Sequence, residues 1–268
     1  MRPDHVISTV KTPSFEMDYL RFGKGESVFV ILPGLSVKSV LGSASAIARQ
    51  YARIAEKHTV YLFDRRKALP SRCTVENMAD DTAEAMDALG LRGVYLFGAS
   101  QGGMIAEVIA IKRPDLVGKL ILGSTACRVT EERFRVLDRW IALSKMGDRV
   151  GLYLDFGESI YPEVVFLKYR DALVLIAGTV SDEELRRFEI LAEGMRDFDV
   201  TDEIGKIRCP VLVLGARDNG VLGPDAVHEI ARALPQNDGT LTYIYDGFGH
   251  AAFDTAPDYC EKIINFIN

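Results

Sequence analysis

The sequence lacks any long apolar run. No stretch of its 268 residues approaches the roughly 18 consecutive apolar residues of a membrane-spanning helix. The opening residues Met-Arg-Pro-Asp-His have no apolar core behind them, so no secretory signal is visible. We therefore expect a cytoplasmic protein with no membrane partner.

Basic residues are also fewer than acidic residues. Lysine and arginine number 32 against 38 aspartate and glutamate residues, which gives a formal net charge of −6 at pH 7. An acidic chain is poorly suited to bind a phosphate backbone or an anionic membrane. We expect a small-molecule substrate and no nucleic-acid partner, and the sequence leaves a homo-oligomer open.

Cysteine is sparse and scattered. Cys73, Cys127, Cys209 and Cys260 lie far apart and form no Cys-x-x-Cys pair. A disulfide framework or a zinc site would need a closer or paired arrangement. We expect isolated thiols, no metal and no cofactor.

Short apolar runs alternate with helical patterns through most of the chain. Strands are predicted at Val6–Val10, Phe15–Tyr19, Ser27–Leu32, Thr59–Phe63, Val94–Phe97, Leu120–Gly123, Pro210–Gly215 and Leu241–Tyr245. Helices are predicted at Ala44–Lys57, Asn77–Leu89, Met104–Lys112, Ala226–Ala233 and Pro257–Ile267. The first two strands should form an antiparallel edge. The rest predicts an α/β fold with a mostly parallel central sheet and helices on both faces.

This alternation breaks after Thr125. From about Cys127 to Asp199 the patterns are helical, and Ser181 with Glu184 has the spacing of a capping box. We therefore divide the chain into a core of residues 1–125 and 200–268 and a helical insertion of residues 126–199.

One motif carries chemistry. Gly98-Ala99-Ser100-Gln101-Gly102 ends an apolar run and leads into a helical pattern, the form of a nucleophile elbow. Strand and helix pass close together at such a turn, so side chains at Gly98 and Gly102 would collide. Ser100 is the candidate nucleophile.

A serine nucleophile needs a base. His250 follows the strand predicted at Leu241–Tyr245 and lies in a glycine-containing loop at the carboxyl edge of the sheet, where open α/β sheets place their sites. His5 lies near the N-terminus, and surface or capping roles suit His58 and His228 better. His250 is therefore the candidate base.

The base in turn needs an orienting acid. Asp218 follows the strand predicted at Pro210–Gly215, and the order Ser100, Asp218, His250 is the order that accompanies a strand–turn–helix elbow. Asp218 could instead be a turn former beside Asn219-Gly220. Its rival Asp225 has the position of a helix-start residue after Pro224. The other rivals, Asp246 and Asp254, are close to His250 in sequence, and neither follows a separate sheet strand in the usual acid position.

Taken together, these motifs resemble the α/β-hydrolase superfamily, in its capped branch of small serine esterases, lactonases and carbon–carbon bond hydrolases. The elbow, the acid strand from Cys209 to Gly215 with Asp218, and Gly249-His250 carry the resemblance. It implies a catalytic triad of Ser100, Asp218 and His250. It also implies a helical cap over the site.

The resemblance further implies an oxyanion hole made by the backbone N–H groups of Leu35 and Gln101. Two departures from the family are visible. Pro33-Gly34 stands where His-Gly is common, and the segment after Asp64 lacks the family's glycines. Arg65 in that segment is expected either to brace the oxyanion loop or to lie in a solvated basic loop.

The implied activity is hydrolysis of a small, apolar carboxylic ester, lactone or related acyl substrate through an acyl-enzyme. A carbon–carbon bond hydrolase, a cofactor-free haloperoxidase-like enzyme and a non-catalytic receptor are the alternatives. A subset of the insertion's large apolar residues is expected to line the acyl pocket, drawn from Phe134, Trp140, Leu143, Tyr153, Phe156, Tyr161 and Phe166.

Overall fold

The computed structural model describes residues 4–234 and 239–268. Its strands form one sheet in the order β1-β2-β4-β3-β5-β6-β7-β8. β2 runs antiparallel to β1 and β4, and the pairs from β4 across to β8 are parallel, as the sequence predicts. The strands are β1 His5–Lys11, β2 Glu16–Phe22, β3 Ser27–Leu32, β4 His58–Arg66, β5 Val94–Ala99, β6 Val117–Gly123, β7 Val211–Ala216 and β8 Thr240–Tyr245.

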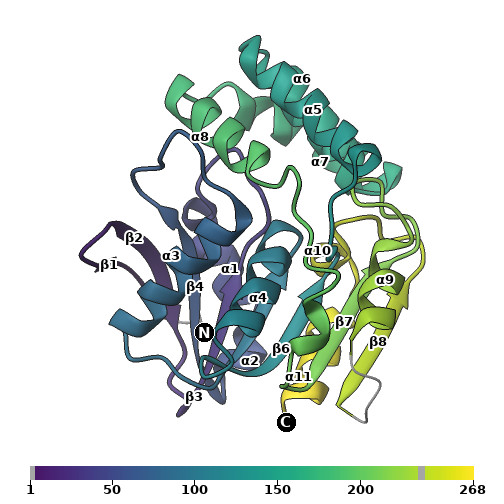
Figure 1. Ribbon diagram of the computed structural model, residues 1–268. Coiled ribbons are helices and arrows are strands. Elements are labelled where there is room, and N and C mark those ends of the chain that lie inside the picture. The colour runs from purple at the N-terminus through teal and green to yellow at the C-terminus, as the bar shows by residue number, and fades with distance from the viewer. Residues whose placement is uncertain (1–3, 235–238) are drawn as a thin grey trace.

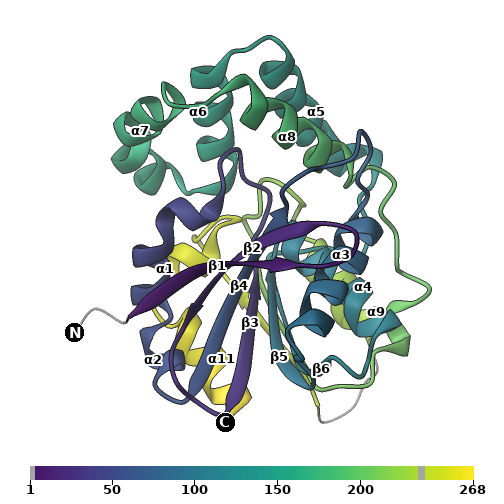
Figure 2. The same cartoon turned by 90° about the vertical axis from the view of Figure 1, so that its left-hand side faces the viewer.

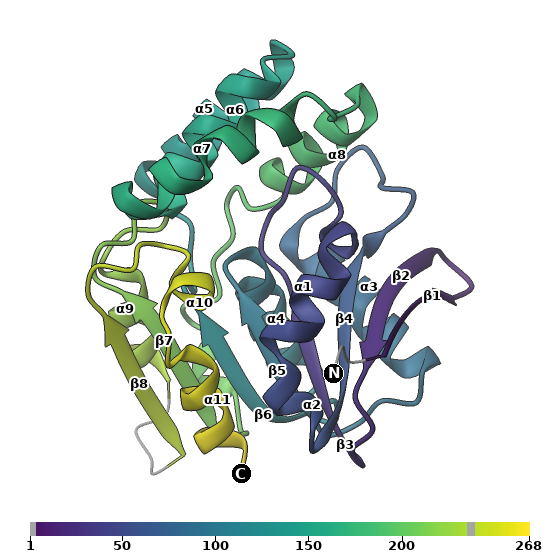
Figure 3. The same ribbon diagram turned by 180° about the vertical axis from the view of Figure 1, so that it is seen from behind.

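Helices cover both faces of this sheet (Figures 1 and 3). One face carries α3 (Val75–Ala88), α4 (Gln101–Lys112) and α9 (Ala226–Ala233), and the other carries α1 (Ala44–Gln50), α2 (Ala52–Ala55) and α11 (Tyr259–Ile267). Because strand side chains alternate between faces, Val30 and Leu32 enter the first core while Phe29 and Ile31 enter the second. The expected two-sided packing is confirmed.

The structure refines the sequence prediction in two places. His5 is the first residue of β1 and pairs with Phe22, so it belongs to the sheet edge. The helix predicted at Ala44–Lys57 divides into α1 and α2 around Tyr51, whose ring is buried against the second core.

Four α-helices lie between β6 and β7: α5 (Glu131–Lys145), α6 (Arg149–Ile160), α7 (Glu163–Ala177) and α8 (Asp182–Glu193). We call them the helical layer. Figures 1 and 2 show the layer stacked on one end of the sheet. The capping box expected at Ser181 and Glu184 is present and begins α8. Within residues 4–234 and 239–268, no helix has the length and apolar character needed to span a membrane.

The turn from β5 into α4 is tightly packed. Ser100 has φ 52° and ψ −122°, a strained conformation for a residue with a side chain. A Cβ on Gly98 would lie 2.2 Å from the Gly102 carbonyl oxygen, and a Cβ on Gly102 would lie 2.0 Å from the Leu32 carbonyl oxygen. Both glycines are therefore required for β3, β5 and α4 to meet as they do.

This packing predicts a large stability loss for Gly102→Ala. The added methyl group must push backbone apart, which we expect to lower the free energy of unfolding by about 3 kcal/mol in urea denaturation. Gly42→Ala is the matched control, because a Cβ there meets no atom within 4 Å. Equal stability of the two variants would contradict this account of the elbow.

Candidate active site

Three side chains from three loops form a hydrogen-bonded chain. His250 Nε2 lies 2.9 Å from Ser100 Oγ, and His250 Nδ1 lies 2.9 Å from Asn219 Oδ1. Ser100 follows β5, Asn219 follows β7 and His250 follows β8, so all three stand at the carboxyl ends of parallel strands. Each is buried, with 8% or less of its surface exposed.

Asp218, the expected orienting acid, does not hydrogen-bond to the imidazole, and Asn219 takes that place, which corrects the expectation. Its carboxylate accepts a hydrogen bond from the Gly249 N–H at 2.9 Å and so holds the loop just before His250. Neighbouring side chains in a tight turn point in different directions, and the turn directs Asn219 inward. Sequence order alone could not separate positions 218 and 219, because both follow the same strand.

Two backbone donors fix the orientation of the Asn219 amide. The N–H groups of Val221 and Leu222 point at Asn219 Oδ1 at 3.1 and 3.0 Å. These donors require an oxygen, and an oxygen can only accept from His250 Nδ1. Nδ1 therefore carries the ring proton, and Nε2 presents its lone pair to the Ser100 hydroxyl. This is the tautomer that a general base requires.

The electrostatic setting of His250 differs from that of a histidine beside a carboxylate. Burial lowers its pKa to about 4, and the neutral amide of Asn219 supplies no negative charge to oppose this shift. The imidazole is consequently uncharged at neutral pH and free to accept a proton.

The loop after β3 lies against the nucleophile. A Cβ on Gly34 would stand 3.2 Å from Ser100 Cβ, so glycine permits the close approach. Leu35, next in this loop, lines the same cavity as Ser100. Gln101 is the first residue of α4, where a backbone N–H has no acceptor within the helix. The two residues expected to supply oxyanion donors thus flank Ser100.

Arg65 braces this region from behind, which confirms the bracing alternative. It is 5% exposed and donates to the Pro33 carbonyl at 2.8 Å and to Gln101 Oε1 at 3.1 Å. Burial lowers its pKa to about 10, so the guanidinium remains charged at neutral pH. The Gln101 amide also donates to the Leu191 carbonyl of α8 at 2.7 Å. One chain of contacts therefore joins Arg65, the elbow and the helical layer.

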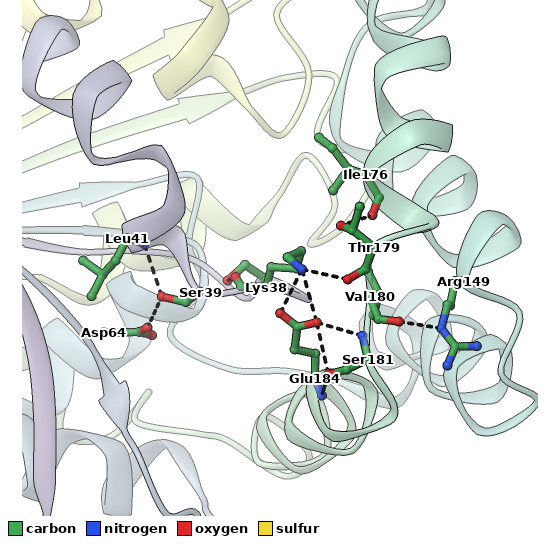
Figure 4. A network of polar contacts seen from close by, with 11 residues as sticks. Lys38, Ser39, Leu41, Asp64, Arg149, Ile176, Thr179, Val180, Ser181 and Glu184 are labelled. Carbon is green, nitrogen blue, oxygen red and sulfur yellow. Dashed lines mark hydrogen bonds and ion pairs between the residues drawn. The ribbon is translucent and has the colours of Figure 1, made fainter.

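A second link ties the same loop to the helical layer (Figure 4). Lys38 Nζ lies 3.0 Å from both the Thr179 carbonyl oxygen and Glu184 Oε1. Ser39 Oγ donates to Asp64 at 2.6 Å on the core side. The loop that carries Gly34 and Leu35 is held between the sheet and α8.

A cavity of about 410 Å³ opens beside Ser100 and His250. Of the seven large apolar residues considered for the pocket, Trp140, Phe156 and Tyr161 line it. The main apolar contribution from the sheet side comes from Ile31, Leu35, Val40, Ile47, Leu62 and Phe97. The pocket is therefore built jointly by the sheet and the helical layer.

The strand order and the serine at a strained strand-to-helix turn define the class of protein. A family model described as alpha/beta hydrolase fold matches residues 28–257. The chain belongs to this family and is an enzyme with the α/β-hydrolase fold.

Individual relatives can then be named. The chain is 26% identical over 245 residues to "Putative carbamate hydrolase RutD" from a Caulobacter species, covering 85% of this chain and 87% of that protein. Among solved structures it is similar to the enol-lactonase from Burkholderia xenovorans, with TM-score 0.83, 18% identity and coverage of 97% and 99%. It is also similar to 2-hydroxy-6-oxo-6-phenylhexa-2,4-dienoate hydrolase from a Rhodococcus strain, with TM-score 0.80, 17% identity and 99% of each chain covered.

The neutral side chain of Asn219 beside His250 leads to a testable prediction for the histidine pKa. We expect NMR to show His250 neutral down to about pH 4. Asn219→Asp should raise this pKa, because a carboxylate at the same place stabilises the imidazolium. A histidine that titrates near 6.5 in the wild-type protein would contradict the described environment.

The same titration has a consequence for stability. Between pH 6.5 and about 4, His250 binds a proton in the unfolded chain and does not bind one in the folded chain. This contribution therefore makes the folded state less stable as the pH falls through that window. In Asn219→Asp, urea denaturation should show a smaller loss over the same range.

Proposed function

We propose that this enzyme is a serine hydrolase that cleaves a small carboxylic ester, lactone or related acyl compound. The 2.9 Å contact between Ser100 Oγ and His250 Nε2, with the tautomer set by Asn219, carries the proposal. A base in hydrogen-bond reach of a serine at a strained turn is the arrangement that activates a hydroxyl nucleophile.

In the first half of the reaction Ser100 Oγ attacks the acyl carbon while His250 Nε2 takes the hydroxyl proton. The backbone N–H groups of Leu35 and Gln101 receive the developing oxyanion. Each such donor is worth about 3 kcal/mol in the transition state. The N-terminal end of α4 favours negative charge at this point, and the charged Arg65 adds to the same field.

In the second half, protonated His250 gives its proton to the leaving alkoxide. A water molecule then loses a proton to His250 Nε2 and attacks the acyl carbon, and Ser100 Oγ leaves with that proton. Asn219 keeps the ring in place through both steps. A neutral acceptor stabilises the imidazolium less than a carboxylate would, by about 1 kcal/mol.

The helical layer serves as a cap in this proposal. Trp140 and Phe156 lie on the cavity with ring centroids 4.4 Å apart and present an apolar surface to an acyl or alcohol group. Water exclusion by such a surface strengthens the interactions of the oxyanion donors. The relatives are named as hydrolases of different substrates. This variety fits a common acyl-transfer site whose cap selects the substrate.

The nucleophile is tested by Ser100→Ala. Hydrolysis of p-nitrophenyl acetate and butyrate should fall at least about 10⁴-fold, because no other group replaces the attacking oxygen. A fluorophosphonate should label the wild-type protein and leave the variant unlabelled. Wild-type rates in Ser100→Ala would refute the proposal, and they would favour a different site for the activity.

The roles of Asp218 and Asn219 are tested as a pair. Asp218→Asn keeps an oxygen for the Gly249 N–H, so kcat should fall less than about tenfold. Asn219→Leu leaves the His250 Nδ1–H unpaired, so kcat should fall roughly 10²- to 10⁴-fold.

Asn219→Asp is the matched variant, since it restores an acceptor of the same shape. It should retain or exceed the wild-type kcat above its raised His250 pKa. If Asp218→Asn loses about 10⁴-fold while Asn219→Leu is nearly silent, Asp218 is the orienting acid in solution and the assignment of Asn219 is wrong.

A further inference from the structure

The active-site cavity has an unusual charge content. Among the described residues that line it, none is lysine or arginine, and Asp254 is the one carboxylate. His250 in the same cavity is neutral at neutral pH. The space into which a substrate must fit therefore carries negative charge with no cation of the protein beside it.

Asp254 is held in place at the end of the cavity formed by α1, α10 (Ala252–Thr255) and the end of α6. Gln50 Nε2 lies 3.4 Å from its Oδ1 and donates to the Phe253 carbonyl at 3.0 Å. Tyr161 lies close enough to Asp254 to affect the pKa of its carboxyl group. The carboxylate is thus bordered by Gln50 of α1 and by Tyr161 at the end of α6.

No ion pair satisfies this carboxylate among the described residues. Asp246, another sequence candidate for the acid, differs in this respect because it pairs with Arg217. Asp254 is solvent-exposed, although desolvation by the protein packed near its carboxyl group raises its pKa. A positively charged ligand group would relieve that desolvation cost.

Three aromatic residues lie near the same carboxylate. Phe253 precedes it in α10, and burial together with the Asp254 charge raises the pKa of the Tyr51 and Tyr161 hydroxyls. All three rings line the cavity. A carboxylate together with aromatic faces is the combination that recognises ammonium groups, through an ion pair and cation–π attraction.

We propose that the Asp254 end of the cavity is a subsite for a positively charged nitrogen group of the substrate. The subsite lies one helical turn after His250, so a substrate would place its acyl carbon at Ser100 and its cationic group beside Asp254. Anionic substrates fit poorly, because the carboxylate repels them. The dienoate named for the similar Rhodococcus hydrolase is such an anion. This inference rests on the proposed function in assigning the cavity to the substrate.

Binding tests the subsite without any turnover. Choline and 3,3-dimethylbutan-1-ol have the same shape and differ by one positive charge. Ser100→Ala protein should bind choline at least about fivefold more tightly, measured by NMR titration. Ser100→Ala/Asp254→Asn should lose that preference, while Ser100→Ala/Asp246→Asn should keep it. Equal affinity of the two ligands for Ser100→Ala protein would overturn the subsite. This outcome does not depend on whether the Asp254 variant folds.

Turnover then extends the test to both sides of the scissile bond. Choline butyrate is compared with 3,3-dimethylbutyl butyrate, and the 4-trimethylammoniobutyrate p-nitrophenyl ester with the 5,5-dimethylhexanoate ester. We expect the cationic member of at least one pair to have kcat/KM about tenfold higher, and Asp254→Asn to abolish that ratio. A preference for the neutral member in both pairs overturns the subsite.

The two proposals fail in different ways. If choline binds as expected and no ester is hydrolysed, the subsite stands and the proposed hydrolase activity is wrong. If neutral esters are hydrolysed through Ser100 and choline shows no advantage in binding or turnover, the hydrolase stands and the subsite is wrong.

Discussion

The hydrogen bond from His250 Nδ1 to Asn219 Oδ1 constrains the chemistry of the whole site. Its direction is fixed because the backbone N–H groups of Val221 and Leu222 donate to the same Asn219 oxygen. That direction fixes the ring proton on Nδ1 and leaves Nε2 facing Ser100. Because the partner is neutral, burial controls the histidine pKa, and the ring stays uncharged over a wide pH range. In the proposed reaction, the imidazolium would be less stabilised in the transition state than beside a carboxylate.

The backbone around Ser100 depends on contacts that reach well beyond this residue. Arg65 binds the Pro33 carbonyl, Lys38 binds α8, and the Gln101 side chain bonds to Leu191. The backbone groups around Ser100 are consequently supported from the sheet and from the helical layer together. In the proposed mechanism the donors must be in place before charge develops, and such support would lower the reorganisation needed during reaction.

Charge is distributed unevenly around the cavity. The buried guanidinium of Arg65 lies behind the loop that carries Gly34 and Leu35, whereas Asp254 lies on the cavity wall. In the proposed reaction, negative charge that develops at the acyl oxygen would meet positive potential, and the Asp254 end of the pocket would present negative potential. A substrate with separated polar ends would be aligned by this field as well as by its shape.

Residue patterns along the chain determined the architecture and two members of the site. The apolar runs specified the parallel sheet, the change of rhythm after Thr125 specified the helices between β6 and β7, and the glycine spacing marked Ser100. His250 followed from its place after a strand. These features are local or periodic along the chain, so the linear sequence is enough to predict them.

Only the tertiary structure decided which of two adjacent residues meets the imidazole. Asp218 and Asn219 follow the same strand, and the inward direction belongs to Asn219 because its oxygen closes a turn onto Val221 and Leu222. From the sequence alone, Asp254 is likewise a loop carboxylate. In the folded structure, α1 and the end of α6 lie beside it. Side-chain direction in turns and the enclosure of a cavity depend on contacts between distant segments, which a sequence pattern does not encode.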